Sequence, residues 1–283
     1  MNIGLVLSGG MAKGAYQVGA LQAISEFFPK GSIQYVSASS IGVLNSYGYL
    51  TGKLDEMADT WRNIEYEGTR MLIGKMLKST YLQQSIKNIC RPEDKIDETF
   101  YITLMNLKKR IVDYQNLQHV DSSLLPRYLK ASVAMPLYNK PVLLCGQNYY
   151  DGAVIDNIPI YPLMKHKIDY IICIYFDEYG YIFENEYFDN KILKLTFSNN
   201  KVISDSLTFS KNAIDNMIIS GYEKTSAILK EVFAKGIEDY EYIYHMIEER
   251  NRGAERKIRI TGDMVVTNVN KIAQKLAKRK IKF

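Results

Sequence analysis

The stretch Ile3-Gly-Leu-Val-Leu-Ser-Gly-Gly-Met-Ala-Lys-Gly14 decides the fold of this chain. Its first half is a short, continuous apolar run bounded by glycine, a pattern typical of a buried parallel strand. A glycine-rich loop ends the run, and apolar residues at helical spacing follow as far as Pro29. We predict a second strand over residues 33–39 and a second helix over 41–49. This alternation indicates an α/β protein whose parallel sheet carries its functional loops at the strand C-termini.

The rest of the chain continues this architecture and then becomes helical. We expect mostly helix over residues 54–97 and 126–134, and further strands over residues 101–107, 110–114, 142–145, 149–150, 169–176 and 192–197. From about residue 205 the apolar residues repeat at helical spacing. We therefore predict an α/β core over residues 1–204. A mainly helical extension, residues 205–283, is expected to pack on this core and to end in a basic tail.

The composition is that of an ordinary globular protein. The chain has 283 residues, of which 47% are hydrophobic and 24% charged, so it can bury a sizeable core. Its formal net charge of +5 is mild and indicates no nucleic-acid partner. Cys90, Cys145 and Cys173 fit neither a metal-ligand pattern nor a disulfide framework, which suits a reducing compartment. Because no apolar run approaches transmembrane length, we expect a cytoplasmic protein with at most peripheral membrane contact; the sequence indicates no oligomeric state.

The segment Ala38-Ser-Ser-Ile-Gly42 lies between a predicted strand and a predicted helix. A serine on a sharp turn of this kind is exposed where a substrate carbonyl can reach it. Either serine could instead cap the helix by accepting hydrogen bonds from free backbone N–H groups. Only Ser40 is followed by a glycine two residues later, which favours Ser40 over Ser39 as a nucleophile.

The loop Gly9-Gly-Met-Ala-Lys-Gly14 precedes the first helix. It lacks the Gly-x-Gly-x-x-Gly spacing of a dinucleotide site, and no Lys-Ser/Thr pair follows it as in a P-loop. Free N–H groups at a helix N-terminus favour negative charge, so the loop could hold a phosphate or the oxyanion of a tetrahedral intermediate. A tight strand-to-helix turn without a ligand is the alternative.

Asp151 begins an Asp-Gly-Ala segment after a predicted hairpin strand. Asp-Gly is often no more than a turn. As a catalytic base, an aspartate titrating at about 3.9 would need its pKa raised by burial, or a serine hydroxyl held directly against it. The three histidines, His119, His166 and His245, lie in polar surroundings without a motif, and we expect them at the surface. A Ser-Asp pair without histidine is therefore the catalytic hypothesis.

Three stretches together resemble the patatin-like phospholipase family. Residues 8–21 look like the glycine-rich loop of the family and the helix after it, and residues 36–45 look like its nucleophile elbow. A third set, residues 131–136, 141–142 and 150–159, is similar to the segment that carries the aspartate of the family. The motifs occur in the same order and at compatible spacing, and the resemblance covers roughly residues 1–197.

The resemblance implies a three-layer α/β/α sandwich with a mostly parallel central sheet. It also implies hydrolysis of lipid acyl esters through an acyl-serine intermediate, without metal or cofactor, and therefore a phospholipid or another acyl-ester lipid as partner. Ser40 corresponds to the nucleophile and Asp151 to its partner in a Ser-Asp dyad. The implied oxyanion hole and elbow consist of the following residues: Gly9, Gly10, Met11 and Ala12 as backbone N–H donors, Lys13 in the family's Lys/Arg position, and Ala38 and Gly42 beside the nucleophile.

Two positions depart from the pattern of the family. Ala38 stands where the elbow usually opens with glycine, and we expect the fold to tolerate the extra methyl group. Met11 stands where a third glycine is common, and a positive φ there would strain the residue and distort the oxyanion hole. These departures keep open a catalytically weak lipid-binding or regulatory protein of the same fold. Among enzymes, a lysophospholipase or broad carboxylesterase is the alternative.

Overall fold

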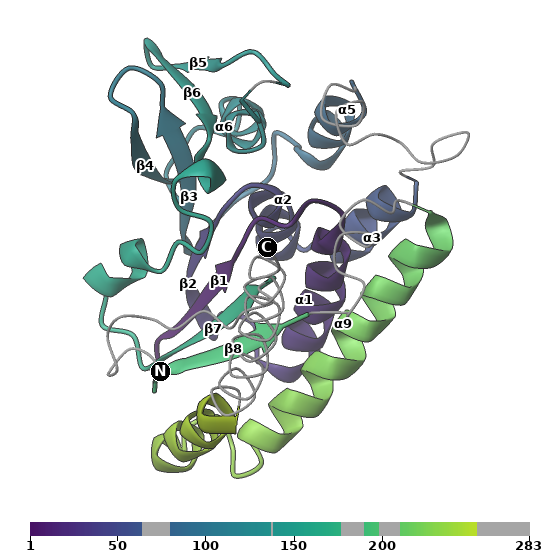
Figure 1. The fold of residues 1–283 in the computed structure, drawn as a ribbon, viewed down its shortest axis with the longest axis vertical. Helices are drawn as coiled ribbons and strands as arrows, with labels where there is room; N and C mark the ends of the chain where they lie inside the picture. Colours follow the sequence, from purple (N-terminus) through teal and green to yellow (C-terminus); the bar gives the residue numbers. More distant parts are fainter. Residues whose placement is uncertain (64–79, 137, 177–189, 198–209, 254–283) are drawn as a thin grey trace, which may run out of the picture.

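A mixed β-sheet forms the centre of the molecule (Figure 1). This computed structural model describes residues 1–63, 80–136, 138–176, 190–197 and 210–253. The strand order is β5-β6-β3-β2-β1-β7-β8, with β4 paired to β3. The strands are β1 Ile3–Leu7, β2 Ile33–Ala38, β3 Thr99–Asn106, β4 Ile111–Asn116, β5 Val142–Leu144, β6 Gln147–Asp151, β7 Tyr170–Tyr175 and β8 Ile192–Thr196.

The apolar runs of the sequence become the central strands of this sheet. Every residue of β1 and of β7 is buried, as expected for parallel strands covered on both faces. Four pairings, β1–β2, β1–β7, β2–β3 and β7–β8, are parallel, and β3–β4, β3–β6 and β5–β6 are antiparallel. The predicted α/β class, a mixed sheet flanked by helices, is confirmed.

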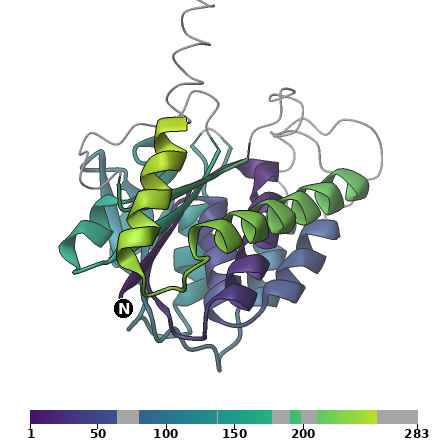
Figure 2. The ribbon, with the colours of Figure 1, turned by 90° about the horizontal axis from the view of Figure 1, so that it is seen from below.

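Helices cover one face of the sheet with a thick layer. They are α1 Gly14–Phe27, α2 Ile41–Leu50, α3 Leu54–Arg62, α5 Thr80–Ile89, α6 Leu125–Ser132 and α9 Lys211–Val232. Figure 2 shows α9 and α1 on the same side of the sheet. On the other face, Ile160 and Leu163, at the short 3-10 helix η3 Tyr161–Lys165, pack against Val6, Ile171 and Cys173. Residues 240–253 form a further helix.

Two glycines allow α9 to lie directly on α1. A Cβ atom on Gly19 would stand 1.9 Å from the carbonyl oxygen of Ile218, and one on Gly221 would stand 2.2 Å from that of Tyr16. The predicted boundary at residues 204–205 and the basic tail lie outside the described residues. The division into a core of residues 1–204 and an extension of residues 205–283 therefore stays a prediction.

Gly19→Ala is expected to destabilise the fold by about 1–3 kcal/mol, because the added methyl group meets backbone atoms that cannot rotate away. Chemical denaturation of the purified protein measures this change. Gly253→Ala is the matched control, since no atom of the described residues lies within 4 Å of a Cβ atom there. Equal stability of the two variants would contradict the close helix contact.

Candidate active site

The site is built where two strands meet end to end along one edge of β3. The end of β2 pairs Ala38 with Ile102, and the end of β6 pairs Asp151 with Leu104. Strand β4 pairs with β3 over residues 101–106, so β2 and β6 must share the opposite edge. Because β2 runs parallel to β3 and β6 antiparallel to it, their C-terminal ends converge at Thr103. Residues 38–42 and 151–153 are thereby brought together.

Ser40 sits on this junction in a strained conformation. It precedes α2 with φ +53° and ψ −129°, and its side chain makes no capping hydrogen bond. The helix-cap alternative therefore does not describe the Ser40 hydroxyl. A Cβ atom on Gly42 would stand 2.7 Å from the Ser8 carbonyl oxygen, so only glycine lets α2 start this close to β1. A non-glycine residue held at positive φ is a common mark of a functional site.

The neighbouring Ser39 is fully buried and has another role. Its hydroxyl donates to the carbonyl oxygen of Asp156 at 3.1 Å and lies 2.7 Å from the hydroxyl of Thr103. Because a serine has one proton to donate, the Thr103 hydroxyl donates in the second bond. Ser39 thus ties the elbow to β3 and to the segment after Asp151. Ser40, by contrast, is only partly buried, and its assignment as the nucleophile stays a prediction.

Asp151 is completely buried beside the elbow. Its Oδ1 accepts the N–H of Ala153 at 2.9 Å, whereas its Oδ2 accepts no hydrogen bond. Burial raises the pKa of Asp151 to about 7, and the nearby Ser40 hydroxyl and the Ala153 amide lower it in part. Gly152 is required because a Cβ atom there would lie 2.5 Å from the backbone of Thr103. The carboxyl is therefore poised to exchange a proton near neutral pH.

The glycine loop lies next to Ser40. A Cβ atom on Gly9 would stand 2.9 Å from the Ser40 Cβ, so the loop backbone passes directly beside the nucleophile. The Gly9 N–H, however, already donates to Asn157 Oδ1 at 2.9 Å, and the Lys13 N–H donates to the Gly10 carbonyl oxygen. Within the described residues the N–H groups of Gly10, Met11 and Ala12 have no acceptor. The candidate oxyanion donors narrow to these three.

Ala38 and Met11, the two departures from the family pattern, differ in backbone conformation. Ala38 is a fully buried residue of β2 without a positive φ, so a glycine is not needed there. Met11 adopts φ +53°, the left-handed region that costs a side-chain-bearing residue about 1–2 kcal/mol. The sequence left the sign of this angle open, and the structure shows the strained case.

Met11→Gly is expected to stabilise the fold by up to about 1 kcal/mol, because glycine adopts a positive φ without steric penalty. Met11→Ala is the matched control: it also removes the side chain but keeps the Cβ atom and its strain. Thermal unfolding of the three proteins measures the difference. If the alanine variant gained as much stability as the glycine variant, the backbone at Met11 would not be the source of strain.

A buried polar network beneath the loop escaped the sequence analysis. Asn45 on α2 donates to the Gly14 carbonyl oxygen at 2.9 Å and to Gln17 Oε1 at 2.8 Å, and accepts the indole N–H of Trp61 at 3.0 Å. Gln17 in turn donates to the Ser8 carbonyl oxygen at 2.7 Å. The network joins both ends of the glycine loop to α2. The sequence does not show which isolated polar residues of different helices contact one another, so this network could not be predicted from it.

The histidines take no part in this arrangement in the described part of the chain. His166 packs on Tyr35 and lies 2.9 Å from the Tyr101 hydroxyl, and no contact joins a histidine to Ser40 or Asp151. The described residues also hold no cluster of three or more His, Cys, Asp or Glu side chains suited to a metal ion. None of the described helices has both the length and the apolar character needed to cross a bilayer.

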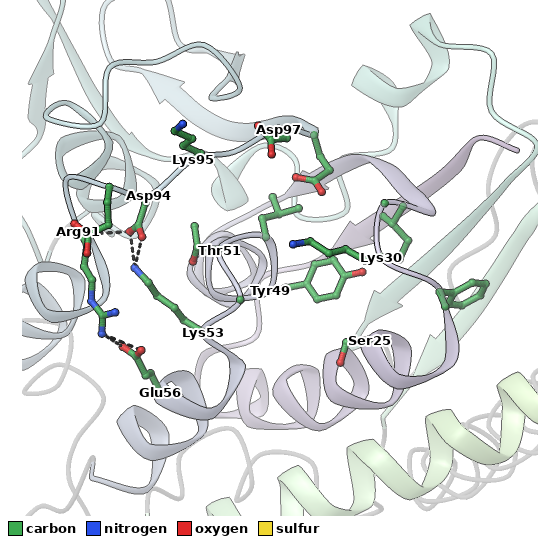
Figure 3. A pocket seen from close by; sticks show the side chains of 17 residues that line it. Ser25, Lys30, Tyr49, Thr51, Lys53, Glu56, Arg91, Asp94, Lys95 and Asp97 are labelled. Carbon is green, nitrogen blue, oxygen red and sulfur yellow. Dashed lines mark hydrogen bonds and ion pairs between the residues drawn. The ribbon is translucent and has the colours of Figure 1, made fainter.

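A hollow of about 700 Å³ lies at the opposite end of the sheet from this junction, where β2 and β3 begin (Figure 3). It is lined by Lys30, Tyr49, Lys53, Asp94 and Lys95 among others, and by none of the predicted site residues. Lys53 and Asp94 form a buried ion pair at its wall. This hollow is thus separate from the junction of β2 and β6.

Comparison with known proteins identifies the family. The family model described as Patatin-like phospholipase matches residues 5–164, which include the end of β1, the glycine loop, the elbow and Asp151. The chain belongs to the patatin-like phospholipase family. The matched range covers more than half of the chain and all of the residues that meet at the β2–β6 junction.

The relatives are distant or much longer proteins. A patatin-like phospholipase domain-containing protein of Caenorhabditis elegans, ZK370.4, is 30% identical in an alignment of 172 residues that covers 56% of this chain but 12% of that protein. Among solved structures, VipD from Legionella pneumophila has a TM-score of 0.49 at 13% identity, over 81% of this chain and 66% of its own. The type III effector ExoU has a TM-score of 0.46 at 13% identity, over 99% and 66%. Membership therefore rests on the sequence match.

Proposed function

We propose that this member of the patatin-like phospholipase family is a lipid acyl hydrolase of the phospholipase A type, with Ser40 as nucleophile and Asp151 as general base. The observation that carries the proposal is the junction of β2 and β6. It sets a partly buried serine on a strained turn beside a fully buried carboxyl with one unpartnered oxygen. The glycine loop, which passes beside Ser40 at Gly9, carries three N–H groups for which the described residues offer no acceptor.

The geometry supports a two-step acyl transfer. Ser40 Oγ attacks the ester carbonyl carbon while its proton passes to Asp151 Oδ2. The N–H groups of Gly10, Met11 and Ala12 would stabilise the oxyanion of the tetrahedral intermediate. Its collapse breaks the ester C–O bond, and the leaving alkoxide takes the proton from Asp151. A water molecule then attacks the acyl-serine and gives one proton to Asp151. Collapse breaks the bond between Ser40 Oγ and the acyl carbon, Ser40 Oγ takes the proton back from Asp151, and the fatty acid leaves.

The buried carboxyl sets the pH dependence of this reaction. Burial raises the pKa of Asp151 to about 7, and the base must be ionised to accept the serine proton. We expect kcat/KM for a soluble ester to rise about tenfold per pH unit below pH 7 and to level off above it. A pH–rate profile from pH 5 to 9 measures this, and a flat profile across pH 7 would contradict the role of Asp151.

A catalytically weak lipid-binding protein is the second candidate. The strained Met11 backbone and the engagement of the Gly9 N–H by Asn157 favour it, because both restrict the oxyanion loop. The deciding experiment measures fatty acid released from phospholipid vesicles by the wild-type chain and by Ser40→Ala. Release that Ser40→Ala abolishes supports hydrolysis at this site. Binding without release would favour the second candidate, and full release by Ser40→Ala would overturn the assignment.

A further inference from the structure

The turn between β3 and β4 combines exposed aliphatic and basic side chains. Its sequence is Leu107-Lys-Lys-Arg-Ile111, and Leu107 and Ile111 are 41% and 47% exposed. The three basic side chains between them are exposed. In the part of the chain that the structure describes, none of these three forms an ion pair or a side-chain hydrogen bond. Aliphatic groups and cations are therefore both presented to the solvent at one tip.

The tip is held firmly by a buried residue. Asn106, with no exposed surface, accepts the N–H of Lys109 on its side chain at 3.0 Å and the N–H of Arg110 on its carbonyl oxygen at 2.8 Å. Its amide group donates to Asp113 at 3.1 Å and also to Gln147. A fully bonded asparagine at the base fixes the path of the turn. The cations thus keep a defined position, which reduces the entropy lost on binding.

The tip lies on the side of the molecule that carries the candidate active site. Asp151 pairs with Leu104, and β3 continues past this point toward the tip, which starts three residues later, about 10 Å further on. The Leu107 N–H donates to the carbonyl oxygen of Asn148, the residue that pairs with Leu143. Leu143 is 51% exposed, so it adds a further exposed aliphatic side chain on this side of the molecule. Figure 1 shows β3 to β6 projecting together at one end of the molecule.

We propose that the tip, residues 107–111, docks this protein on a bilayer surface that contains anionic lipid. Unpaired cations attract anionic head groups, and the flanking aliphatic side chains can enter the boundary between head groups and acyl chains. Docking there would bring the bilayer to the end of the sheet where Ser40 and Asp151 meet. The choice of lipid as the partner rests on the proposed function. The charges and exposed fractions of the tip residues are properties of the structure and hold whatever the function is.

The test is flotation of the Ser40→Ala chain with two kinds of vesicle, pure phosphatidylcholine and phosphatidylcholine with about one third phosphatidylserine. Ser40→Ala keeps hydrolysis from altering the vesicles. Each cation contributes about fivefold to binding, so Lys108→Gln/Lys109→Gln/Arg110→Gln is expected to weaken binding to anionic vesicles roughly 100-fold. Lys30→Gln/Lys87→Gln/Lys230→Gln is the matched control, because it removes the same charge from exposed positions elsewhere.

A second variant separates a membrane from another acidic partner. Leu107→Asn/Ile111→Asn keeps all three cations and should weaken binding to anionic vesicles but not to heparin, a soluble polyanion. Equal loss in the tip and control variants, no binding by the parent chain, or full binding by the Asn variant would overturn the proposal. Hydrolysis of a soluble ester by the tip variants in the Ser40 background reports separately on the proposed function, because it needs no membrane.

Discussion

Asp151→Asn is expected to abolish ester hydrolysis and, at the same time, to make the fold more stable above pH 7. Asparagine keeps the shape and the acceptor for the Ala153 N–H, but it cannot take the proton of Ser40. Loss of a base that works as a unit with its nucleophile lowers kcat by roughly 10³-fold or more. Ester hydrolysis at pH 8 measures the loss of activity.

The stability gain follows from the raised pKa of Asp151. In the unfolded chain the group titrates at about 3.9, whereas burial raises its pKa to about 7 in the folded protein. The folded state therefore binds a proton more tightly, and wild-type stability falls as the pH rises from 4 to 7. The full effect is on the order of 4 kcal/mol. Above pH 7 the asparagine variant avoids this penalty.

Urea denaturation of wild type and Asp151→Asn at pH 5 and pH 8 measures the prediction. The difference in unfolding free energy should be larger at pH 8. Ser40→Ala is the control, because it removes activity but leaves the buried carboxylate. If Asp151→Asn were less stable than wild type at pH 8, contacts absent from this structure would have to stabilise the ionised carboxylate. That result would contradict the raised pKa of Asp151.

Lys53→Met is expected to destabilise the fold by about 3–5 kcal/mol, the largest loss of stability that we predict. Lys53 and Asp94 are each only 6% exposed; Lys53 Nζ lies 2.5 Å from Asp94 and also donates to the Ile89 carbonyl oxygen at 2.6 Å. Figure 3 shows Lys53 directed at Asp94. Removing the lysine leaves a buried carboxylate facing Tyr47 without its cation. Denaturant unfolding at pH 7 measures the loss.

The neighbouring pair Arg91–Glu56 supplies the control. These side chains are 47% and 44% exposed, so Arg91→Gln should cost less than about 1 kcal/mol. Burial works to raise the pKa of Asp94, but hydrogen bonds from Lys53 and Tyr47 hold it below its ordinary value. The ion pair therefore stabilises above the unfolded pKa and is lost as the pH falls. A Lys53→Met effect that did not shrink toward pH 3 would contradict this origin.

The sequence predicted the parts of this fold that depend on local pattern. The apolar run at residues 3–7 is a buried parallel strand, the run predicted at 169–176 contains the buried parallel strand β7, and the glycine loop precedes a helix. The β3–β4 and β5–β6 hairpins were also expected, because turn residues separate short strands there. These features depend on residues that are close in sequence, so they can be predicted from one sequence.

The remaining features depend on contacts between distant segments. The meeting of β2 and β6 on one edge of β3 comes from strand order, which no local pattern encodes. The same holds for the capture of the Gly9 N–H by Asn157 and for the burial of Lys53 against Asp94. The positive φ of Met11 could not be predicted from the sequence, because residues with a side chain rarely adopt this conformation. The roles of Ser40 and Asp151 stay predictions until chemistry tests them.

The most direct test of the proposed dyad is labelling with a fluorophosphonate followed by peptide mass spectrometry. The probe forms a covalent bond only with an activated serine in the folded protein. We expect the adduct on Ser40 in the wild-type chain, a much slower reaction in Asp151→Asn, and no adduct in Ser40→Ala. An adduct on Ser39 or another serine, or labelling of Ser40 at an unchanged rate in Asp151→Asn, would contradict activation of Ser40 by Asp151.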